Sequence, residues 1–162
     1  METIDDVDLD RPFLGQLATD DAERLNAAIA RATVVAFATA EYHGGLASVT
    51  KPVIENPSFP SVLAGKSVGL LGVAAGRIRA IKSLESLCAV CSHTGAIVLP
   101  GPISVAGART VFDAYGKCMD AGTEKAIRSL GTAMTHYVQQ NVCPRMALAM
   151  VQADARVWRA PA

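Results

Sequence analysis

The segment Thr33–Gly45 reads Thr-Val-Val-Ala-Phe-Ala-Thr-Ala-Glu-Tyr-His-Gly-Gly, a short apolar run followed at once by an aromatic ring, an imidazole and two glycines. Continuous apolar runs rich in β-branched and aromatic residues are typical of parallel strands that are buried on both faces. Ligands of open parallel sheets bind beyond the carboxyl ends of such strands. We therefore predict an α/β protein in which Tyr42, His43 and Gly44 belong to a binding loop.

Two further apolar runs follow the first at intervals of about thirty residues, and each interval contains a helical pattern. This is the spacing of consecutive βαβ units, whose right-handed crossovers place helices on both faces of a parallel sheet. Pro52 makes the first of these helices short or kinked, and Gly95 is expected to end the second. The predicted strands are Thr33–Ala38, Lys66–Val73 and Ala96–Leu99, and the predicted helices between them are Leu46–Glu55 and Ala75–Thr94.

The segments outside this repeat are read in the same way. The mixed acidic and apolar residues Ile4–Leu9 favour an edge strand, and Thr19 or Asp20 can cap a helix that precedes Thr33. Pro100–Gly107 reads as a loop. A last long helix carries the stripe Ile127, Leu130, Met134, Tyr137 and Val138, and Cys143–Pro144 is expected to end it. We therefore predict one domain over residues 1–144 and a tail without regular structure at 145–162.

The composition limits the partners of this domain. The chain has 162 residues, of which 51% are hydrophobic and 19% charged, and its 15 basic residues balance its 15 acidic ones. Without a Lys/Arg cluster, binding to nucleic acid has little support. The longest apolar run, Val68–Gly76, is far shorter than the roughly twenty residues of a membrane span, and Met1–Asp10 does not resemble a signal peptide. We expect a soluble, cytoplasmic protein that acts on a small molecule.

The four cysteines include the pair Cys88 and Cys91, which has the C-x-x-C spacing of redox and zinc sites. The pair falls late in its predicted helix, whereas a low-pKa thiol pair is found at a helix N-terminus. Together with Ile81 and Leu84, the two cysteines form one apolar stripe, which favours a role as core residues. We expect no metal site, and a zinc or thiol-redox protein is the last of our three readings.

A second candidate loop follows the second predicted strand, where Gly72-Val73-Ala74-Ala75-Gly76-Arg77 leads into a helix. Small residues before a helix leave backbone N–H groups free to meet an anionic or carbonyl-rich ligand. The stretch matches neither G-x-G-x-x-G nor a Walker A loop, and a tight strand-to-helix connection is the alternative interpretation. Because it follows a parallel strand that neighbours the first, it is expected at the same end of the sheet.

In these loops and beyond them, the chain resembles the NAD(P)H-dependent FMN reductase family of flavodoxin-like proteins, in order from about residue 2 to about residue 140. The resemblance implies a flavodoxin-like three-layer sandwich with a parallel sheet. It is carried by Thr39-Ala40-Glu41-Tyr42-His43-Gly44-Gly45, by Ala74-Ala75-Gly76-Arg77-Ile78-Arg79-Ala80-Ile81-Lys82-Ser83-Leu84, and by Ile97-Val98-Leu99-Pro100-Gly101-Pro102-Ile103-Ser104-Val105 with Phe112-Asp113 behind it.

The resemblance also implies a function. Family members bind FMN, take hydride from NAD(P)H and pass electrons to a quinone, an azo compound, a metal oxyanion or a free flavin, commonly as homodimers or homotetramers. The flavin carries the chemistry, so no catalytic acid–base pair is expected. The residues implied to contact the flavin are Glu41, Tyr42, His43, Gly44, Ala74, Ala75, Gly76 and Arg77.

The chain departs from the family pattern at three places. Ala40 stands where family members commonly have proline, and Pro52 interrupts a helix that is usually regular. Family members open with a strand, a Gly-Ser-x-Arg loop that holds the FMN phosphate and a helix, and no such turn precedes Ile4. We therefore expect a sheet without its first strand, in a truncated reductase. The alternative is a cofactor-free flavodoxin-like remnant that acts as an interaction or assembly module.

Overall fold

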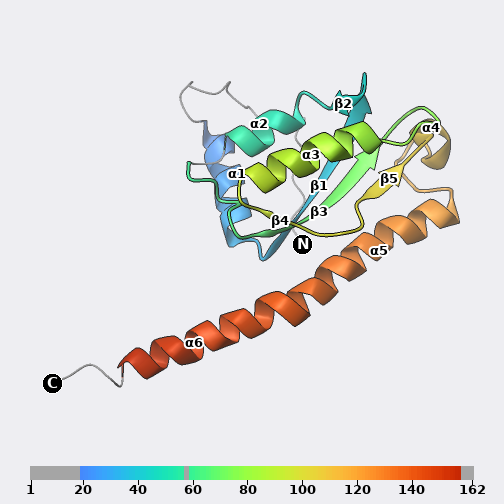
Figure 1. The fold of residues 1–162 in the computed structure, drawn as a ribbon. Helices are drawn as coiled ribbons and strands as arrows, with labels where there is room; N and C mark the ends of the chain where they lie inside the picture. The colour runs from blue at the N-terminus through green and yellow to red at the C-terminus, as the bar shows by residue number, and fades with distance from the viewer. Residues whose placement is uncertain (1–18, 57–58, 158–162) are drawn as a thin grey trace.

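The computed structural model describes residues 19–56 and 59–157, with side chains up to residue 153, and they form a sheet with helices on both faces (Figure 1). The sheet has the order β2-β1-β3-β4, and β5 also pairs with β3. The elements are α1 (Asp20–Arg31), β1 (Val34–Tyr42), β2 (Gly45–Leu46), α2 (Thr50–Glu55), β3 (Ser67–Val73), α3 (Ile81–His93), β4 (Ile97–Val98), β5 (Ile103–Val105), α4 (Ala108–Val111), α5 (Ala121–Tyr137), the π-helical turn η2 (Val138–Val142) and α6 (Cys143–Val157).

The parallel strands predicted from the apolar runs form the centre of the sheet. β1 pairs with β3 over seven positions, from Val34 opposite Ser67 to Ala40 opposite Val73. The other edge of β3 pairs in parallel with two short strands. β4 pairs with the start of β3, and β5 pairs with its end. The predicted third strand, Ala96–Leu99, is found as β4, but the loop predicted at Pro100–Gly107 is wrong at Ile103–Val105, which form β5.

One face of the sheet is covered by helices and contains most of the core. Of the two predicted caps, Thr19 rather than Asp20 caps α1, by accepting a hydrogen bond of 3.2 Å from the N–H of Ala22. α2 is short, as predicted, and α3 begins at Ile81 rather than at Ala75. Alternate residues of β1 and β3 pack against these helices. The buried cluster comprises Leu25, Ile29, Phe37, Val53, Ile54, Leu63, Val68, Leu70, Leu84, Leu87 and Cys91.

Among the described residues, α5 covers the opposite face. A Cβ atom built at Gly69 of β3 would lie 2.6 Å from Sδ of Met134 and 3.3 Å from Cδ1 of Leu130, so α5 packs directly over this glycine. Ala36, which is opposite Gly69 in the register, and Ala38 point to the same face and are exposed. Among the described residues, α5 therefore covers Gly69 of β3, while Ala36 and Ala38 of β1 are exposed.

The last helix does not end at Pro144, so this prediction is wrong. α5 continues through η2 into α6, and the predicted absence of structure after residue 144 is also wrong for the described part of the tail. Proline in a helix lacks the N–H that would bond four residues back, and its ring collides with that turn. Here the preceding turn is widened, with the Cys143 N–H bonded to the Val138 carbonyl five residues back, which accommodates the proline.

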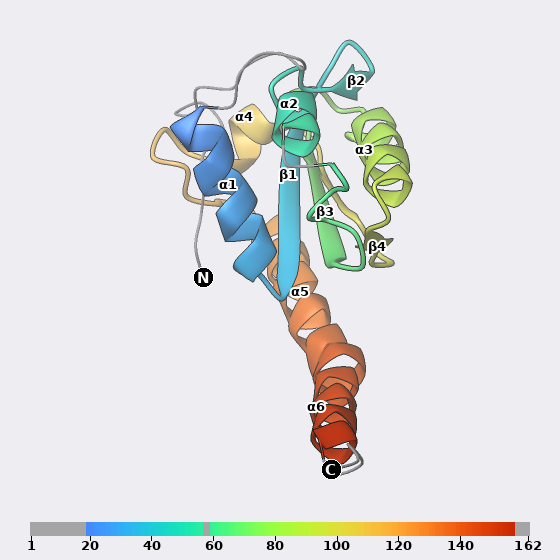
Figure 2. The same cartoon turned by 90° about the vertical axis from the view of Figure 1, so that its left-hand side faces the viewer.

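Figure 2, which views the molecule from another side, shows that α6 leaves the body of the domain. The edge strand predicted at Ile4–Leu9, and the predicted lack of a first strand, concern residues before 19 and lie outside the described residues. The predicted fold class, α/β with a parallel sheet between layers of helices, is confirmed over the described residues.

Candidate functional site

The first predicted loop is a β-hairpin rather than an irregular loop. β1 extends through Tyr42, which pairs antiparallel with Gly45 of β2. The two residues between them, His43 with φ of 51° and Gly44 with φ of 76°, are both left-handed. This is the geometry of a type I′ turn, which matches the twist of its strands and which glycine and, at some cost, histidine can adopt. The side chain of Tyr42 is 65% exposed beside this turn.

The second predicted loop is fixed at its base and open at its tip. The N–H of Ala74 donates to the carbonyl of Val105 at 2.8 Å, and the Gly107 N–H donates to the Gly76 carbonyl at 2.9 Å. Residues 75–79 are all exposed. Among the hydrogen bonds of the described residues, none has a backbone N–H of 75–79 as its donor. The loop is therefore held in place while its N–H groups stay available.

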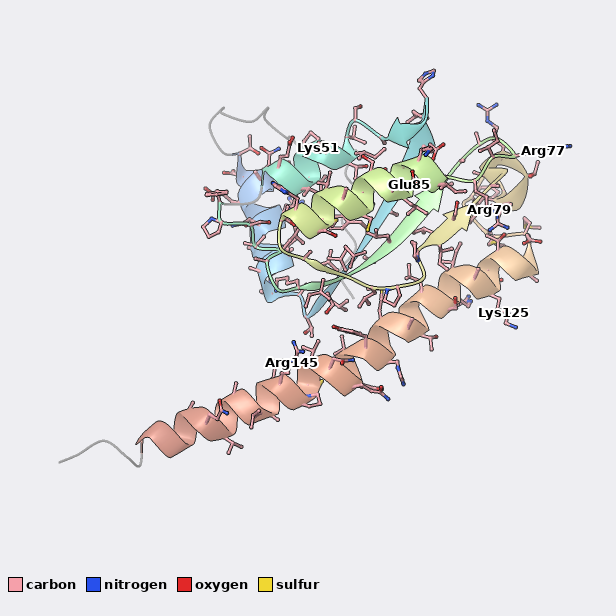
Figure 3. The ribbon with its side chains drawn as sticks, in the orientation of Figure 1. Lys51, Arg77, Arg79, Glu85, Lys125 and Arg145 are labelled. Carbon is pink, nitrogen blue, oxygen red and sulfur yellow. The ribbon has the colours of Figure 1, made fainter. Side chains whose placement is uncertain are left out.

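The hairpin and this second loop lie at the same rim of the sheet. Both follow the carboxyl ends of β1 and β3, which run parallel and stay in register up to Ala40 and Val73. In Figure 1 the β2 hairpin and the segment after β3 are found at the same end of the domain. Figure 3 shows Arg77 at this end, pointing outward from the loop. The structure thus brings the predicted residues to one rim, which we call the ligand rim (residues 41–45 and 74–79).

Glu41 has a contact that the sequence did not reveal. Its Oε2 accepts a hydrogen bond of 3.0 Å from the backbone N–H of Ser83, in the first turn of α3. The N-cap residue of α3, Ala80, has no side chain that could cap the helix. A carboxylate at a helix N-terminus is favoured by the unpaired N–H groups and by the helix dipole. Glu41 therefore ties the hairpin to α3, and its carboxylate is engaged there.

Two polar residues beneath the rim were also missed. Oγ1 of the buried Thr39 lies 2.9 Å from Oγ1 of Thr50 and accepts a 3.2 Å hydrogen bond from the Ala47 N–H, so it braces the base of the hairpin. The alternation Val35, Phe37, Thr39 placed a hydroxyl on the buried face, and this was the available signal. Ser104 Oγ, on β5 opposite Gly72, is buried without a hydrogen-bond partner among the described residues.

Two cavities in the described part of the chain lie away from the ligand rim. One, of about 480 Å³, runs along α5 and is lined by Lys125, Arg128, Ser129, Thr132, Ala133 and His136. The other, of about 500 Å³, lies between α5 and the segment 112–118. Neither is lined by a predicted site residue. The ligand rim is instead a surface feature, in which residues 42–44 and 75–79 are exposed to solvent.

The cysteine pair belongs to the core, as predicted. Cys91 is 0% exposed, and Cys88 packs against the buried cluster. Burial, with a smaller contribution from Cys88, raises the pKa of the Cys91 thiol to about 11. Because the thiolate is the reactive form, this thiol is inert at neutral pH. The described residues contain no group of three or more potential metal ligands, and no described helix is long and apolar enough to cross a membrane.

Comparisons with known proteins identify the family of this chain. A family model described as NADPH-dependent FMN reductase matches residues 2–110. A Pseudomonas aeruginosa protein named NAD(P)H-dependent FMN reductase is 28% identical over 121 residues, which is 73% of this chain and 65% of that protein. The chain thus spans less than two thirds of the length of this relative.

Two solved structures share the fold. FerB, a flavoenzyme NAD(P)H:(acceptor) oxidoreductase from Paracoccus denitrificans, superposes with a TM-score of 0.69 at 21% identity, covering 83% of this chain and 78% of that one. An oxidoreductase from Corynebacterium diphtheriae gives a TM-score of 0.60 at 19% identity, covering 77% and 66%. The flavodoxin-like fold that the sequence predicted is therefore confirmed.

Proposed function

We propose, because the chain belongs to the NADPH-dependent FMN reductase family, that it binds FMN at the ligand rim and transfers electrons from NAD(P)H to a small-molecule acceptor. One observation supports this most directly. The two loops that resemble the flavin-contacting loops of the family come together at one rim, and the N–H groups of residues 75–79 have no partner among the described residues. FMN, when bound, supplies the hydride and electron chemistry.

The residues at the rim fit the ring side of a flavin. The N–H groups of Ala75, Gly76 and Arg77 are available to donate hydrogen bonds to ring carbonyls. Gly76 has open space where a side chain would be, with no atom within 4 Å of a built Cβ. Tyr42 offers an exposed aromatic surface to a flat ring. Within residues 19–56 and 59–157 we identify such groups for the ring side only.

The remaining rim residues have supporting parts in this proposal. The left-handed turn at His43 and Gly44 lets the backbone approach the ring closely. Arg77 supplies a positive charge for a phosphate or a ring carbonyl. Glu41 acts through α3 rather than on the ligand, since its carboxylate is bonded to Ser83. Quinones, azo compounds, metal oxyanions and free flavins remain the proposed acceptors, and a cytoplasmic homodimer or homotetramer the proposed form.

Substitution of Gly76 by leucine tests this proposal. The open space around Gly76 lets the fold accept the larger side chain, which would occupy the position proposed for the ring. We expect the wild-type chain to quench FMN fluorescence on titration and to oxidise NAD(P)H with at least one proposed acceptor. Gly76→Leu should weaken FMN binding at least roughly tenfold, a change of about 1.4 kcal/mol.

Gly131→Leu is the matched control, because Gly131 is exposed on α5 and also has no atom within 4 Å of a built Cβ. It should bind FMN as the wild-type chain does. A wild-type chain that takes up no FMN, or a Gly76→Leu chain that binds it normally, contradicts the proposal. The first outcome would favour the assembly module, for which the exposed apolar side chains of α6 are the supporting observation.

A further inference from the structure

The first turn of α3 lacks the cap that a helix usually takes from its own sequence. The first N–H groups of a helix have no partner within it, and a side chain at the N-cap position ordinarily accepts one of them. The N-cap residue here is Ala80, which has no such side chain, and the hydroxyl of Ser83 donates a 3.0 Å hydrogen bond to the Ala80 carbonyl. Ser83 is 0% exposed, so its backbone N–H needs a partner within the protein.

Glu41 supplies this cap from the β-hairpin. The Ser83 N–H, in the third residue of α3, donates its 3.0 Å hydrogen bond to Oε2 of Glu41, and this N–H is one that an N-cap side chain ordinarily binds. Glu41 directly precedes Tyr42 in the hairpin, and Ser83 follows shortly after the loop 75–79. One side chain thus connects the two loops of the ligand rim.

The connection lies beyond the paired part of the sheet. The register of β1 and β3 ends at Ala40 and Val73, just before the two loops. α3 contacts β2, and Figure 1 shows the start of α3 next to the β2 hairpin. Among the side-chain hydrogen bonds of the described residues, the one from Ser83 to Glu41 alone joins residues 41–46 to residues 74–83. The spacing of the two loops therefore depends on this carboxylate.

We propose that Glu41 is a positioning residue for the flavin ring, an inference that rests on the function proposed above. By capping α3 from the hairpin, Glu41 fixes the spacing between residues 42–44 and residues 75–79. A ring bound between these two loops then holds both of them, so occupancy of the rim is transmitted to the first turn of α3. Glutamine at position 41 keeps an oxygen that can accept the Ser83 N–H, and alanine removes it.

FMN titration of the full-length chain with Glu41→Ala, Glu41→Gln and Glu41→Asp tests this role. Glu41→Ala should bind FMN roughly tenfold more weakly, as the loss of a helix cap predicts, and Glu41→Gln should stay within roughly threefold of the wild-type chain. Glu41→Asp keeps the charge on a shorter side chain, so it should resemble Glu41→Ala. An aspartate variant that binds as the wild-type chain does overturns the proposal, because charge rather than position would then matter.

The visible circular dichroism of bound FMN separates positioning from stability. At saturating FMN, the spectrum of Glu41→Ala should differ from that of the wild-type chain, because the ring then has different surroundings, and the spectrum of Glu41→Gln should match it. A residue that only stabilises the fold would leave the spectrum of the saturated protein unchanged. An unchanged spectrum for Glu41→Ala therefore overturns the proposal.

Hydrogen exchange at the Ser83 amide measures the transmission itself. FMN binding should slow this exchange at least roughly tenfold in the wild-type chain, and saturating FMN should not slow it in Glu41→Ala. Glu85→Ala is the matched control, because Glu85 is a carboxylate near the start of α3 that bonds Lys82 at the surface, at 2.9 Å (Figure 3). It should bind FMN and slow the Ser83 exchange as the wild-type chain does.

The outcomes distinguish this inference from the function on which it rests. A wild-type chain that takes up no FMN overturns both. A wild-type chain that binds FMN, with Glu41→Ala binding it equally well or slowing the Ser83 exchange equally, overturns the inference about Glu41 alone.

Discussion

The two faces of the sheet differ in how tightly they are closed, and two glycines of β3 show the difference. On the face covered by α1–α3, a Cβ atom at Gly72 would lie 2.8 Å from Cγ of Leu84 and 2.9 Å from Cβ of Ala80. On the other face, a Cβ atom at Gly69 would meet the thioether of Met134, which can move. On the first face, which we call the closed face, the groups that pack against the strand cannot easily move. On the second face, the side chain that packs against the strand can move.

The buried residues follow the same division. Leu63, Leu87 and Cys91 on the closed face are 0% exposed, whereas Leu130 is the buried residue of α5. Over the described residues, the comparison shows that most of the buried core lies on one face of the sheet. Three substitution experiments sharpen the comparison.

The largest effect is expected at Leu87, in the centre of the closed face. Leu87→Ala removes a fully buried side chain and should lower the free energy of unfolding by about 3–4 kcal/mol, as cavity-forming leucine substitutions do. Leu148→Ala in α6 makes the same chemical change at a side chain that is 58% exposed, and it should cost well under 1 kcal/mol in the monomer. Urea denaturation at low protein concentration measures both. Equal losses would contradict the placement of Leu87 in the core and of Leu148 on an exposed helix surface.

A smaller difference is expected between the two glycines. Gly72→Ala should destabilise the protein by about 1–3 kcal/mol, because α3 has to move away from the strand. Gly69→Ala should cost less than about 1 kcal/mol, since the side chain of Met134 can turn aside. Thermal unfolding of the pair gives the order directly, and the reverse order would contradict the assignment of the stiff and adaptable faces.

The smallest effect concerns pH and the N-terminus of α5. Asp120 caps this helix by accepting a 2.7 Å hydrogen bond from the Thr123 N–H, and this bond lowers the pKa of the carboxyl group. The contribution of a carboxylate with a lowered pKa is complete above the ordinary aspartate value of about 3.9 and is lost as the pH falls through the folded value. Asp120→Ala should therefore be less stable than wild type at pH 7, and the difference should shrink toward pH 2. A difference in melting temperature that stays constant over this range would contradict the prediction.

The sequence predicted the features that depend on local pattern. The apolar runs located β1 and β3, and Thr19 was one of two predicted caps, with Asp20, because capping depends on a residue and its next three neighbours. The family and the fold were predicted from the resemblance and are confirmed. The flavin-contacting residues remain a prediction, which the Gly76→Leu titration addresses.

Features that depend on distant or cooperative contacts were not predicted. Glu41 accepts a hydrogen bond at the start of α3, 42 residues further along the chain, and no local sequence pattern predicts such a bond. β5 is a strand because Ile103–Val105 pair with the edge of β3. The helix crosses Pro144 because the turn before it widens, an alternative that the usual rule for proline does not include.

The widened turn at Val138–Val142 also separates what the two halves of the long helix can do. One extra residue in a turn shifts the angular phase of everything after it by about 100°, the rotation per residue of a 3.6-residue helix. The side chains of α6 therefore do not continue the stripe that α5 presents to β3. One inserted residue thus lets α5 and α6, although they form one continuous helix, present their side chains in different directions. Deleting that residue would rotate the side chains of α6 about the helix axis without changing their sequence.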